Sequence, residues 1–363
     1  MVNQYSAPIL VACLALPAWA LAEIPSPNYP TADAGLGEKI GETETEDVTA
    51  LIESISEKIR TQYSPGSARR DQHPKAHGCV SATFTVNKDI PDNLRAGLFQ
   101  PGAQYGSVIR FSNGIPNPDS DDRNYDSRGM AMRLRGVSGD KLVPDPTAPD
   151  AQDFVLISSP AFIMNDSHPY VEFFEAVNQG GAAWLRVPFI LGWQGSVNAA
   201  HLFFRTISHP IYTQYFSITP YQLGEGEKRQ AVKYSARACD QTPRPMPANN
   251  ADKNFLRTTM QESLSKDSAC MEFMIQSNKG TNLSVEDVMT EWDQKTAPFV
   301  PVAQIDIHQQ KFDTAEQNLA CENMSFNPWH ALPAHKPLGG INRLRQAVYQ
   351  AISKLRHEMN MPH

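Results

Sequence analysis

The chain has 363 residues, of which 41% are hydrophobic and 20% are charged, and its formal net charge is −7. This length is ample for a large core, and the ordinary aromatic and glycine contents exclude disordered and fibrous classes of protein. The mild acidity and the lack of a Lys/Arg-rich run argue against nucleic acid as a partner.

The first segment has the pattern of a secretory signal peptide over residues 1–22. An apolar stretch over residues 9–16 precedes the small-x-small sequence Ala20-Leu21-Ala22. The stretch is too short, and too interrupted by proline, to span a bilayer stably. We therefore expect a periplasmic or secreted protein with no integral membrane segment after signal removal.

Four cysteines remain beyond the expected signal: Cys79, Cys239, Cys270 and Cys321. In an oxidising compartment they allow one or two disulfides, whose connectivity the sequence does not give, and buried free thiols are the alternative. Their spacing contains no CxxC metal or redox motif.

The next elements in chain order predict an α+β barrel with helices packed around it. Residues 23–46 are rich in Pro, Gly, Glu and Thr and read as an extended arm, and the helical apolar spacing of residues 48–59 completes an N-terminal arm and helix over 23–64. Short apolar or alternating runs then predict strands at 79–86, 107–112, 129–136, 153–158, 229–237, 269–276 and 301–307. Helical patterns appear at 170–177 and after Pro337.

Two histidines stand just before the first of these strands. His73 and His77 have a spacing that can bind zinc on a helix, but Pro74 and Gly78 disfavour a helix there. Ordinary loop or core histidines are the alternative for both residues.

Near the C-terminus, Arg345 and Tyr349 are one helical turn apart within an amphipathic pattern. Taken alone, such a pair is most simply a surface contact.

Four motifs together change this interpretation, because in their order and spacing they resemble the haem-dependent catalase family, in particular its branch of small catalase-like peroxidases. The motifs are His73-Pro74-Lys75-Ala76, Arg110-Phe111-Ser112, Asp126-Ser127-Arg128-Gly129-Met130-Ala131 and Arg345 to Tyr349. The resemblance covers about residues 69–356. It implies a catalase-like haem-binding domain over 65–363 with an antiparallel β-barrel core and surrounding helices.

The resemblance implies that Tyr349 is the metal ligand, bound to haem iron as a phenolate. A phenol ordinarily ionises with a pKa of about 10, so coordination and a nearby cation must stabilise the charged form. Arg345 suits this role because a guanidinium stays charged when buried.

The resemblance also implies the residues on the peroxide side. His73 would move a proton between the two peroxide oxygens, and Ser112 would orient its imidazole. Arg110 and Arg128 would bind haem propionates, with ion pairs to acidic side chains as the alternative. Arg69 and Arg70 are further propionate candidates.

Two departures from the family pattern bear on the chemistry. Ser158 stands where catalases carry an asparagine that places the peroxide, which favours peroxidase activity over efficient dismutation. Ala76 replaces the usual glycine, and the interval from His73 to Phe84 is one residue longer than the family pattern, which makes His77 a rival for the proton-transfer role.

The resemblance thus implies an oxidoreductase, a haem peroxidase or catalase-like enzyme. It would reduce hydrogen peroxide or organic hydroperoxides through an oxo-ferryl intermediate, with a small-molecule electron donor as partner. The alternatives are a haem enzyme that rearranges fatty-acid hydroperoxides and a non-catalytic haem-binding protein of the same fold.

Overall fold

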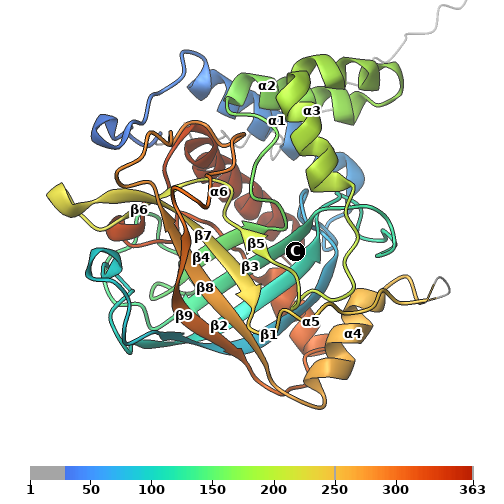
Figure 1. Cartoon of the computed structure of the whole chain (residues 1–363). Coiled ribbons are helices and arrows are strands. Elements are labelled where there is room, and N and C mark those ends of the chain that lie inside the picture. The colour runs from blue at the N-terminus through green and yellow to red at the C-terminus, as the bar shows by residue number, and fades with distance from the viewer. Residues whose placement is uncertain (1–28, 249–250, 362–363) are drawn as a thin grey trace, which may run out of the picture.

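The computed structural model describes residues 29–248 and 251–361, so the expected signal peptide lies outside the described part (Figure 1). Its strands form one antiparallel sheet in the order β5-β4-β3-β2-β1-β9-β8-β7-β6, and a further pairing of β5 with β7 closes this sheet into a barrel. The strands are β1 (Ala76–Val86), β2 (Gln104–Asn113), β3 (Arg128–Arg135), β4 (Gln152–Ile157), β5 (Tyr215–Phe216), β6 (Tyr221–Leu223), β7 (Gln230–Ala238), β8 (Ala269–Ser277) and β9 (Phe299–Ile307).

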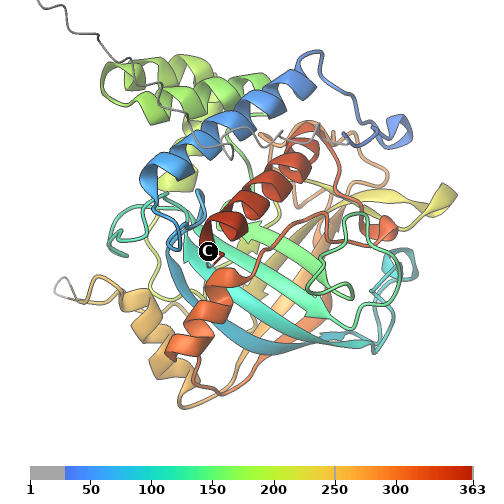
Figure 2. The same ribbon diagram turned by 180° about the vertical axis from the view of Figure 1, so that it is seen from behind.

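Helices surround this barrel (Figures 1 and 2). They are α1 (Glu44–Gln62), α2 (Ser167–Gln179), α3 (Val187–Phe203), α4 (Phe255–Leu264), α5 (Ala315–Asn323) and α6 (Gly340–Asn360). Short 3₁₀ helices are η2 (Ala34–Leu36), η3 (Asp92–Leu94), η4 (Gly181–Arg186), η5 (Gly226–Lys228) and η6 (Pro333–His335). Helix α6 lies along the barrel, while α1, α2 and α3 form a layer beyond one end of it (Figure 2). The α+β barrel with surrounding helices is therefore confirmed.

The interior of the barrel is a packed core. Side chains alternate between the two faces of a strand, and in β2 Ile109 and Phe111 are fully buried in the main hydrophobic cluster. The alternate residues Arg110 and Ser112 point to the other face of the sheet. Aromatic rings fill the centre, with centroid separations of 4.9 Å for Phe154–Phe273 and 5.0 Å for Phe154–Tyr234. The polar side chains of β2 are thus left to build a site outside this core.

A buried ion cluster fixes the start of α6 to the N-terminal arm. The fully buried Arg343 pairs with Glu38 and Glu44 at 2.7 Å each and with Glu286 at 3.2 Å. Tyr29 donates a hydrogen bond to Glu44 at 2.6 Å. Removing the guanidinium would leave several carboxylates buried without compensation, which is strongly destabilising. The cluster therefore holds α6, the helix of Arg345 and Tyr349, in place.

Cys79, Cys239, Cys270 and Cys321 all form disulfides, so the structure has two bridges and none of these four is a free thiol. One disulfide joins Cys79 on β1 to Cys321 on α5, and the other joins Cys239 to Cys270. Among the described residues, no helix is long and apolar enough to cross a membrane.

Candidate active site

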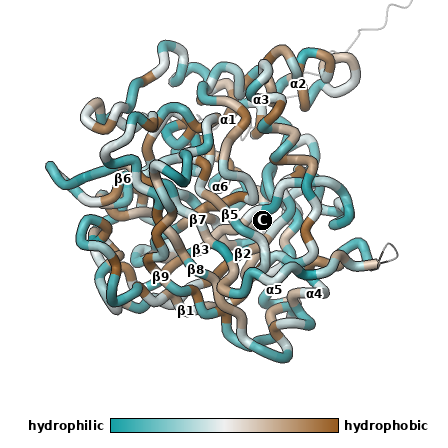
Figure 3. Tube along the Cα trace, viewed as in Figure 1, coloured by the Kyte–Doolittle hydropathy of each residue, from teal (hydrophilic) through white to brown (hydrophobic). Residues whose placement is uncertain are grey.

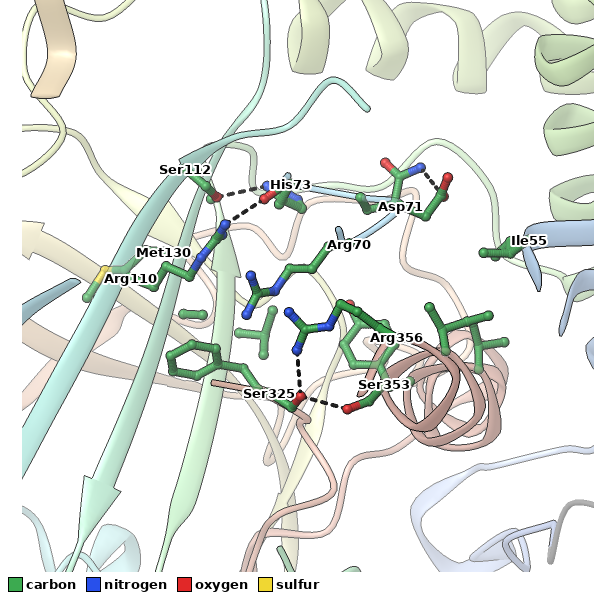
Figure 4. Close-up of a pocket in the computed structure, with 18 of the residues that line it drawn as sticks. Ile55, Arg70, Asp71, His73, Arg110, Ser112, Met130, Ser325, Ser353 and Arg356 are labelled. Atoms are coloured by element: carbon green, nitrogen blue, oxygen red, sulfur yellow. Dashed lines mark hydrogen bonds between the residues drawn. The ribbon is translucent and has the colours of Figure 1, made fainter. Parts of the chain in front are cut away.

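A cavity with an empty volume of about 900 Å³ lies between α6, the loop before β1 and strands β2–β4 (Figure 4). This volume includes space open to solvent, and about 160 Å³ of it can hold the centre of a water molecule. The polar residues that line it are Arg70, Asp71, Gln72, His73, Arg110, Ser112, Ser325, Tyr349, Ser353 and Arg356. The apolar part of the lining comprises Ile55, Gly129, Met130, Ala131, Val155, Leu156, Phe326, Val348 and Ile352.

His73 and Ser112 form one wall of the cavity. The imidazole Nδ1 of His73 lies 3.2 Å from the Ser112 hydroxyl. The His73 backbone is in the left-handed region, with φ 57°, and its carbonyl accepts a hydrogen bond from Arg110 Nη2 at 2.9 Å. Burial, reinforced by the positive charge of Arg110, lowers the pKa of His73 to about 4. The imidazole is therefore neutral near pH 7 and able to accept a proton.

The space behind this pair requires a glycine. A Cβ atom on Gly129, the second residue of β3, would lie 2.6 Å from His73 Nδ1 and 2.8 Å from the Ser112 hydroxyl oxygen. These contacts are shorter than van der Waals distance, so any side chain would push the imidazole or the hydroxyl away. The glycine thus fixes the position of His73.

Tyr349 lines the cavity from α6, and Arg345 supports it from behind. Arg345 Nη2 lies 3.3 Å from the Tyr349 hydroxyl, and the guanidinium is 5.2 Å from the ring centroid. Arg345 Nη1 donates to Asn342 Oδ1 at 3.1 Å and to Thr219 Oγ1 at 3.3 Å. Within the described chain no carboxylate lies within ion-pair distance of Arg345, so its charge is available to stabilise a Tyr349 phenolate.

Three arginines gather at another part of the lining, where Figure 4 shows Arg70, Arg110 and Arg356 close together. They share the carboxylate of Glu322, at 3.0 Å from Arg70, 3.3 Å from Arg356 and 4.0 Å from Arg110. Burial and the charge of Arg70 lower the pKa of Arg110 well below its usual range, and Arg110 Nε has no hydrogen-bond partner. One carboxylate against three guanidiniums leaves a positive site suited to further anions.

Three residues expected at the site do not line the cavity. The buried Arg128 pairs with Asp126 at 3.0 Å and donates to backbone carbonyls, so the structure favours the ion-pair alternative over a propionate contact. Ser158 is also buried, and its hydroxyl accepts a hydrogen bond from the Arg128 backbone N–H at 2.9 Å. That hydroxyl therefore joins β4 to β3 and is not presented to a substrate. Arg69 is exposed and likewise does not line the cavity.

His77, the rival to His73, lies elsewhere. Its side chain is buried, 3.8 Å from Asp122 Oδ2, and neither ring nitrogen has a hydrogen-bond partner among the described residues. It does not line the cavity. In the described part of the chain, no group of three or more His, Cys, Asp or Glu side chains is arranged to hold a metal ion, so the zinc alternative gains no support.

Sequence reasoning missed Gly129 and Arg356 as site residues. Arg356 follows Tyr349 by seven positions, which is two helical turns, so both side chains face the same direction from α6. The seven-residue spacing could have indicated that Arg356 belongs to the site. The need for glycine at position 129 could not be read from the sequence, because it arises where the loop residue His73 packs against strand β3.

Comparison with known proteins agrees with this architecture. A family model described as catalase matches residues 36–191. A fungal catalase structure has a TM-score of 0.59 at 16% identity and covers 84% of this chain and 62% of its own. A bacterial catalase has a TM-score of 0.59 at 18% identity, with 92% of this chain and 64% of its own covered. Catalase A from Saccharomyces cerevisiae has a TM-score of 0.59 at 17% identity, with 91% and 68% covered.

A curated relative is the linolenate 9R-lipoxygenase of Nostoc sp. (strain PCC 7120), which is 24% identical over 308 residues. The match covers 77% of this chain and 37% of the relative, so the chain spans little more than a third of that protein.

The barrel with its flanking helices is the catalase fold. The family model described as catalase matches residues 36–191, which is less than half of the chain, and the fold is that of the catalase structures.

Catalases typically bind haem, and the residues that line this cavity fit that group. Tyr349 supplies a phenol beside the guanidinium of Arg345, which has no ion-pair partner among the described residues, as an iron(III) ligand needs. Arg70, Arg110 and Arg356 supply three cations for two propionates. The unpartnered Arg110 Nε is the kind of buried donor that a bound anion would satisfy.

Proposed function

We propose that this protein is a haem-dependent peroxidase that reduces hydrogen peroxide or organic hydroperoxides with electrons from a small-molecule donor. The observation that supports it best is the meeting of three groups at one cavity: the His73–Ser112 pair, the Tyr349–Arg345 pair and the arginine cluster. Bound haem would supply the redox centre that gives two electrons to the O–O bond and recovers them from the donor.

The protein's own contribution to peroxide cleavage is proton transfer by His73. The neutral imidazole accepts a proton from one oxygen of a peroxide in the cavity and returns it to the oxygen that leaves as water or an alcohol. Ser112 holds Nδ1, which leaves Nε2 for the substrate. On the other wall, Tyr349 would ligate the iron as a phenolate, and the positive charge of Arg345 would stabilise that form.

Peroxidase activity is favoured over dismutation because this chain lacks the asparagine amide that positions the peroxide in catalases. Ser158 stands in place of that amide, and its hydroxyl is engaged by the Arg128 backbone. Protein expressed with ample haem should show an intense Soret absorption band and should oxidise a phenolic donor faster than it releases O₂ from hydrogen peroxide. The lack of a Soret band would contradict every haem-dependent function, and efficient O₂ release would indicate a catalase.

A fatty-acid hydroperoxide is a second candidate substrate, because much of the lining is apolar, including Ile55, Val348 and Ile352. The name of the Nostoc relative, a linolenate lipoxygenase, adds to this candidate. Product analysis with linoleic acid hydroperoxide separates the two chemistries. Peroxidase activity gives the hydroxy acid and consumes donor, whereas rearrangement gives isomers without a donor.

Gly129→Ala should lower the rate of peroxide-dependent donor oxidation by about a hundredfold, since a displacement of about 1 Å at a reacting group can cost that much. The matched control is Gly106→Ala in β2, where a Cβ meets nothing within 4 Å. Rates and thermal unfolding of both variants, loaded with haem, should be measured together. Equal rates in the two variants would contradict the role given to Gly129.

We also propose export to the periplasm or the cell exterior. The signal-like pattern of residues 1–22 supports it, as do two disulfides, which persist in oxidising compartments. Mass spectrometry of the mature chain should give an N-terminus at Glu23, and an intact Met1 would contradict cleavage.

A further inference from the structure

The outermost helical layer carries large apolar side chains that face solvent. Trp184 and Leu185 on η4 are 52% and 75% exposed, and Phe189 and Trp193 on α3 are 88% and 84% exposed. We call these four residues the apolar cap. They lie within ten residues of one another, on the helical layer that projects beyond the barrel (Figures 1 and 3). Exposed apolar clusters of this kind mark interaction surfaces.

The cap is part of an ordered unit with its own core. Val187 and Leu191, between the exposed residues, are buried against Ile163, Met164 and Ala176. Gly192, with φ 61°, breaks the helix between Phe189 and Trp193. The four side chains therefore face outward although their neighbours pack inward.

The chain segment that carries the cap contains basic residues but no acidic ones. Residues 180–205 contain Arg186 and Arg205 but no Asp or Glu, in a chain with 39 acidic and 32 basic residues. Arg186 is exposed and has no ion-pair partner among the described residues. The cap is thus an apolar surface with a free cation on it.

We propose that the apolar cap docks on the surface of an anionic lipid bilayer. Trp and Phe side chains enter the boundary between headgroups and acyl chains, to a depth of about 5–10 Å, and a basic residue pairs with anionic headgroups. A symmetric contact between two copies explains the charge less well. It would place the same patch opposite itself, so Arg186 would meet no carboxylate from the cap.

The position of the cap suggests the substrate class, an inference that rests on the proposed function. Tyr170 on α2 packs against both the core under the cap and the cluster shared by α1 and α6. That second cluster contains Val348 and Ile352, which line the cavity. A docked protein would therefore hold its cavity beside a bilayer, where hydroperoxides of fatty acyl chains form.

Tryptophan fluorescence can report docking directly, because Trp292 and Trp329 are buried while Trp184 and Trp193 are exposed. Trp19 lies outside the described residues and within the proposed signal peptide, so the protein tested is the mature chain that begins at Glu23. Vesicles of phosphatidylcholine with phosphatidylglycerol should shift the emission to shorter wavelength and co-sediment the haem-loaded protein. Vesicles of phosphatidylcholine alone should bind it more weakly.

Three variants make this test specific. Phe189→Ser should weaken partitioning about tenfold, the loss expected for one large apolar side chain. Arg186→Glu should weaken binding to anionic vesicles and leave binding to phosphatidylcholine unchanged. The control is Leu319→Ser on α5, where a leucine is 63% exposed far from the cap in sequence.

Equal binding by Phe189→Ser and Leu319→Ser, or no binding by the parent protein, would overturn the docking proposal. A dimer of the parent protein that Phe189→Ser converts to monomer, without vesicle binding, would assign the cap to a contact between copies. Turnover of the soluble substrate tert-butyl hydroperoxide keeps the two proposals apart. If the protein turns over tert-butyl hydroperoxide but does not bind vesicles, only the docking proposal is contradicted. If it does not turn over tert-butyl hydroperoxide, the proposed peroxidase function is contradicted.

Discussion

His73→Ala is expected to lower kcat/KM for hydrogen peroxide by about a hundredfold to ten-thousandfold, the usual contribution of a general acid–base group. The haem Soret band should remain, because His73 contributes neither the phenolate nor the arginine cluster. Stopped-flow mixing of the haem-loaded variant with peroxide would measure the loss. The imidazole is suited to this work because burial keeps it neutral, with its pKa lowered to about 4.

The pH dependence gives an independent check on His73. The neutral form is the active base, and a pKa of about 4 means that protonation removes it only in acid. The rate should therefore hold from neutral pH down to about 5 and fall as the pH approaches 4. A loss of activity centred near 6.5, the ordinary histidine pKa, would contradict the buried environment described here.

His77→Ala is the matched control for His73. His77 lies off the cavity, beside Asp122, so its removal should affect stability more than the rate of peroxide cleavage. If activity persists in His73→Ala and disappears in His77→Ala, the proton-transfer role belongs to His77.

Tyr349→Phe is expected to remove the iron ligand and so to change the haem absorption and electron paramagnetic resonance spectra together. Loss of residues that only support a metal ligand costs about 10- to 100-fold in affinity, and loss of the ligand itself should exceed that. Transfer of haem to an excess of an apo-globin would measure the affinity. The variant also leaves the Arg345 guanidinium without its contact to the Tyr349 hydroxyl.

Arg345→Leu separates support from ligation. It keeps the phenol, so the spectra should still be those of a tyrosinate complex, while haem affinity falls by about 10- to 100-fold. Wild-type spectra in Tyr349→Phe would contradict the assignment of Tyr349 as ligand, whatever the result for Arg345→Leu.

The barrel could be predicted because its strands are buried on one face and therefore alternate in sequence. In β3, for example, Met130, Met132 and Leu134 all point into the core. Strands β5 and β6 have only two and three residues, which is too few for an alternating pattern. Their position in the sheet depends on pairing with β7. Helix α3 was not predicted, because Pro188, Gly192 and exposed aromatic residues interrupt the apolar periodicity of about 3.6 residues that marks a surface helix.

Contacts in the site could be predicted where the two residues are close in sequence. They could not be predicted where the partners are distant in sequence and are brought together by folding. Arg345 and Tyr349 meet because helical neighbours always do. Arg110 and Arg128 look equivalent in sequence, yet Arg128 is neutralised by Asp126, whereas Arg110 shares one carboxylate with two other arginines. Which of two buried arginines keeps a free charge depends on residues distant in the chain, such as Glu322.

The disulfide between Cys79 and Cys321 connects assembly of the site to the redox state of its surroundings. Glu322, the carboxylate that the three arginines share, directly follows Cys321, and Cys79 pairs across the sheet with Arg110. The bridge thus fixes the acidic and basic partners of one cluster at a constant separation. Reduced protein would have to hold Glu322 among those arginines through non-covalent contacts alone. Oxidation of the thiols would then precede tight haem capture, so that assembly of the site would follow formation of this bridge.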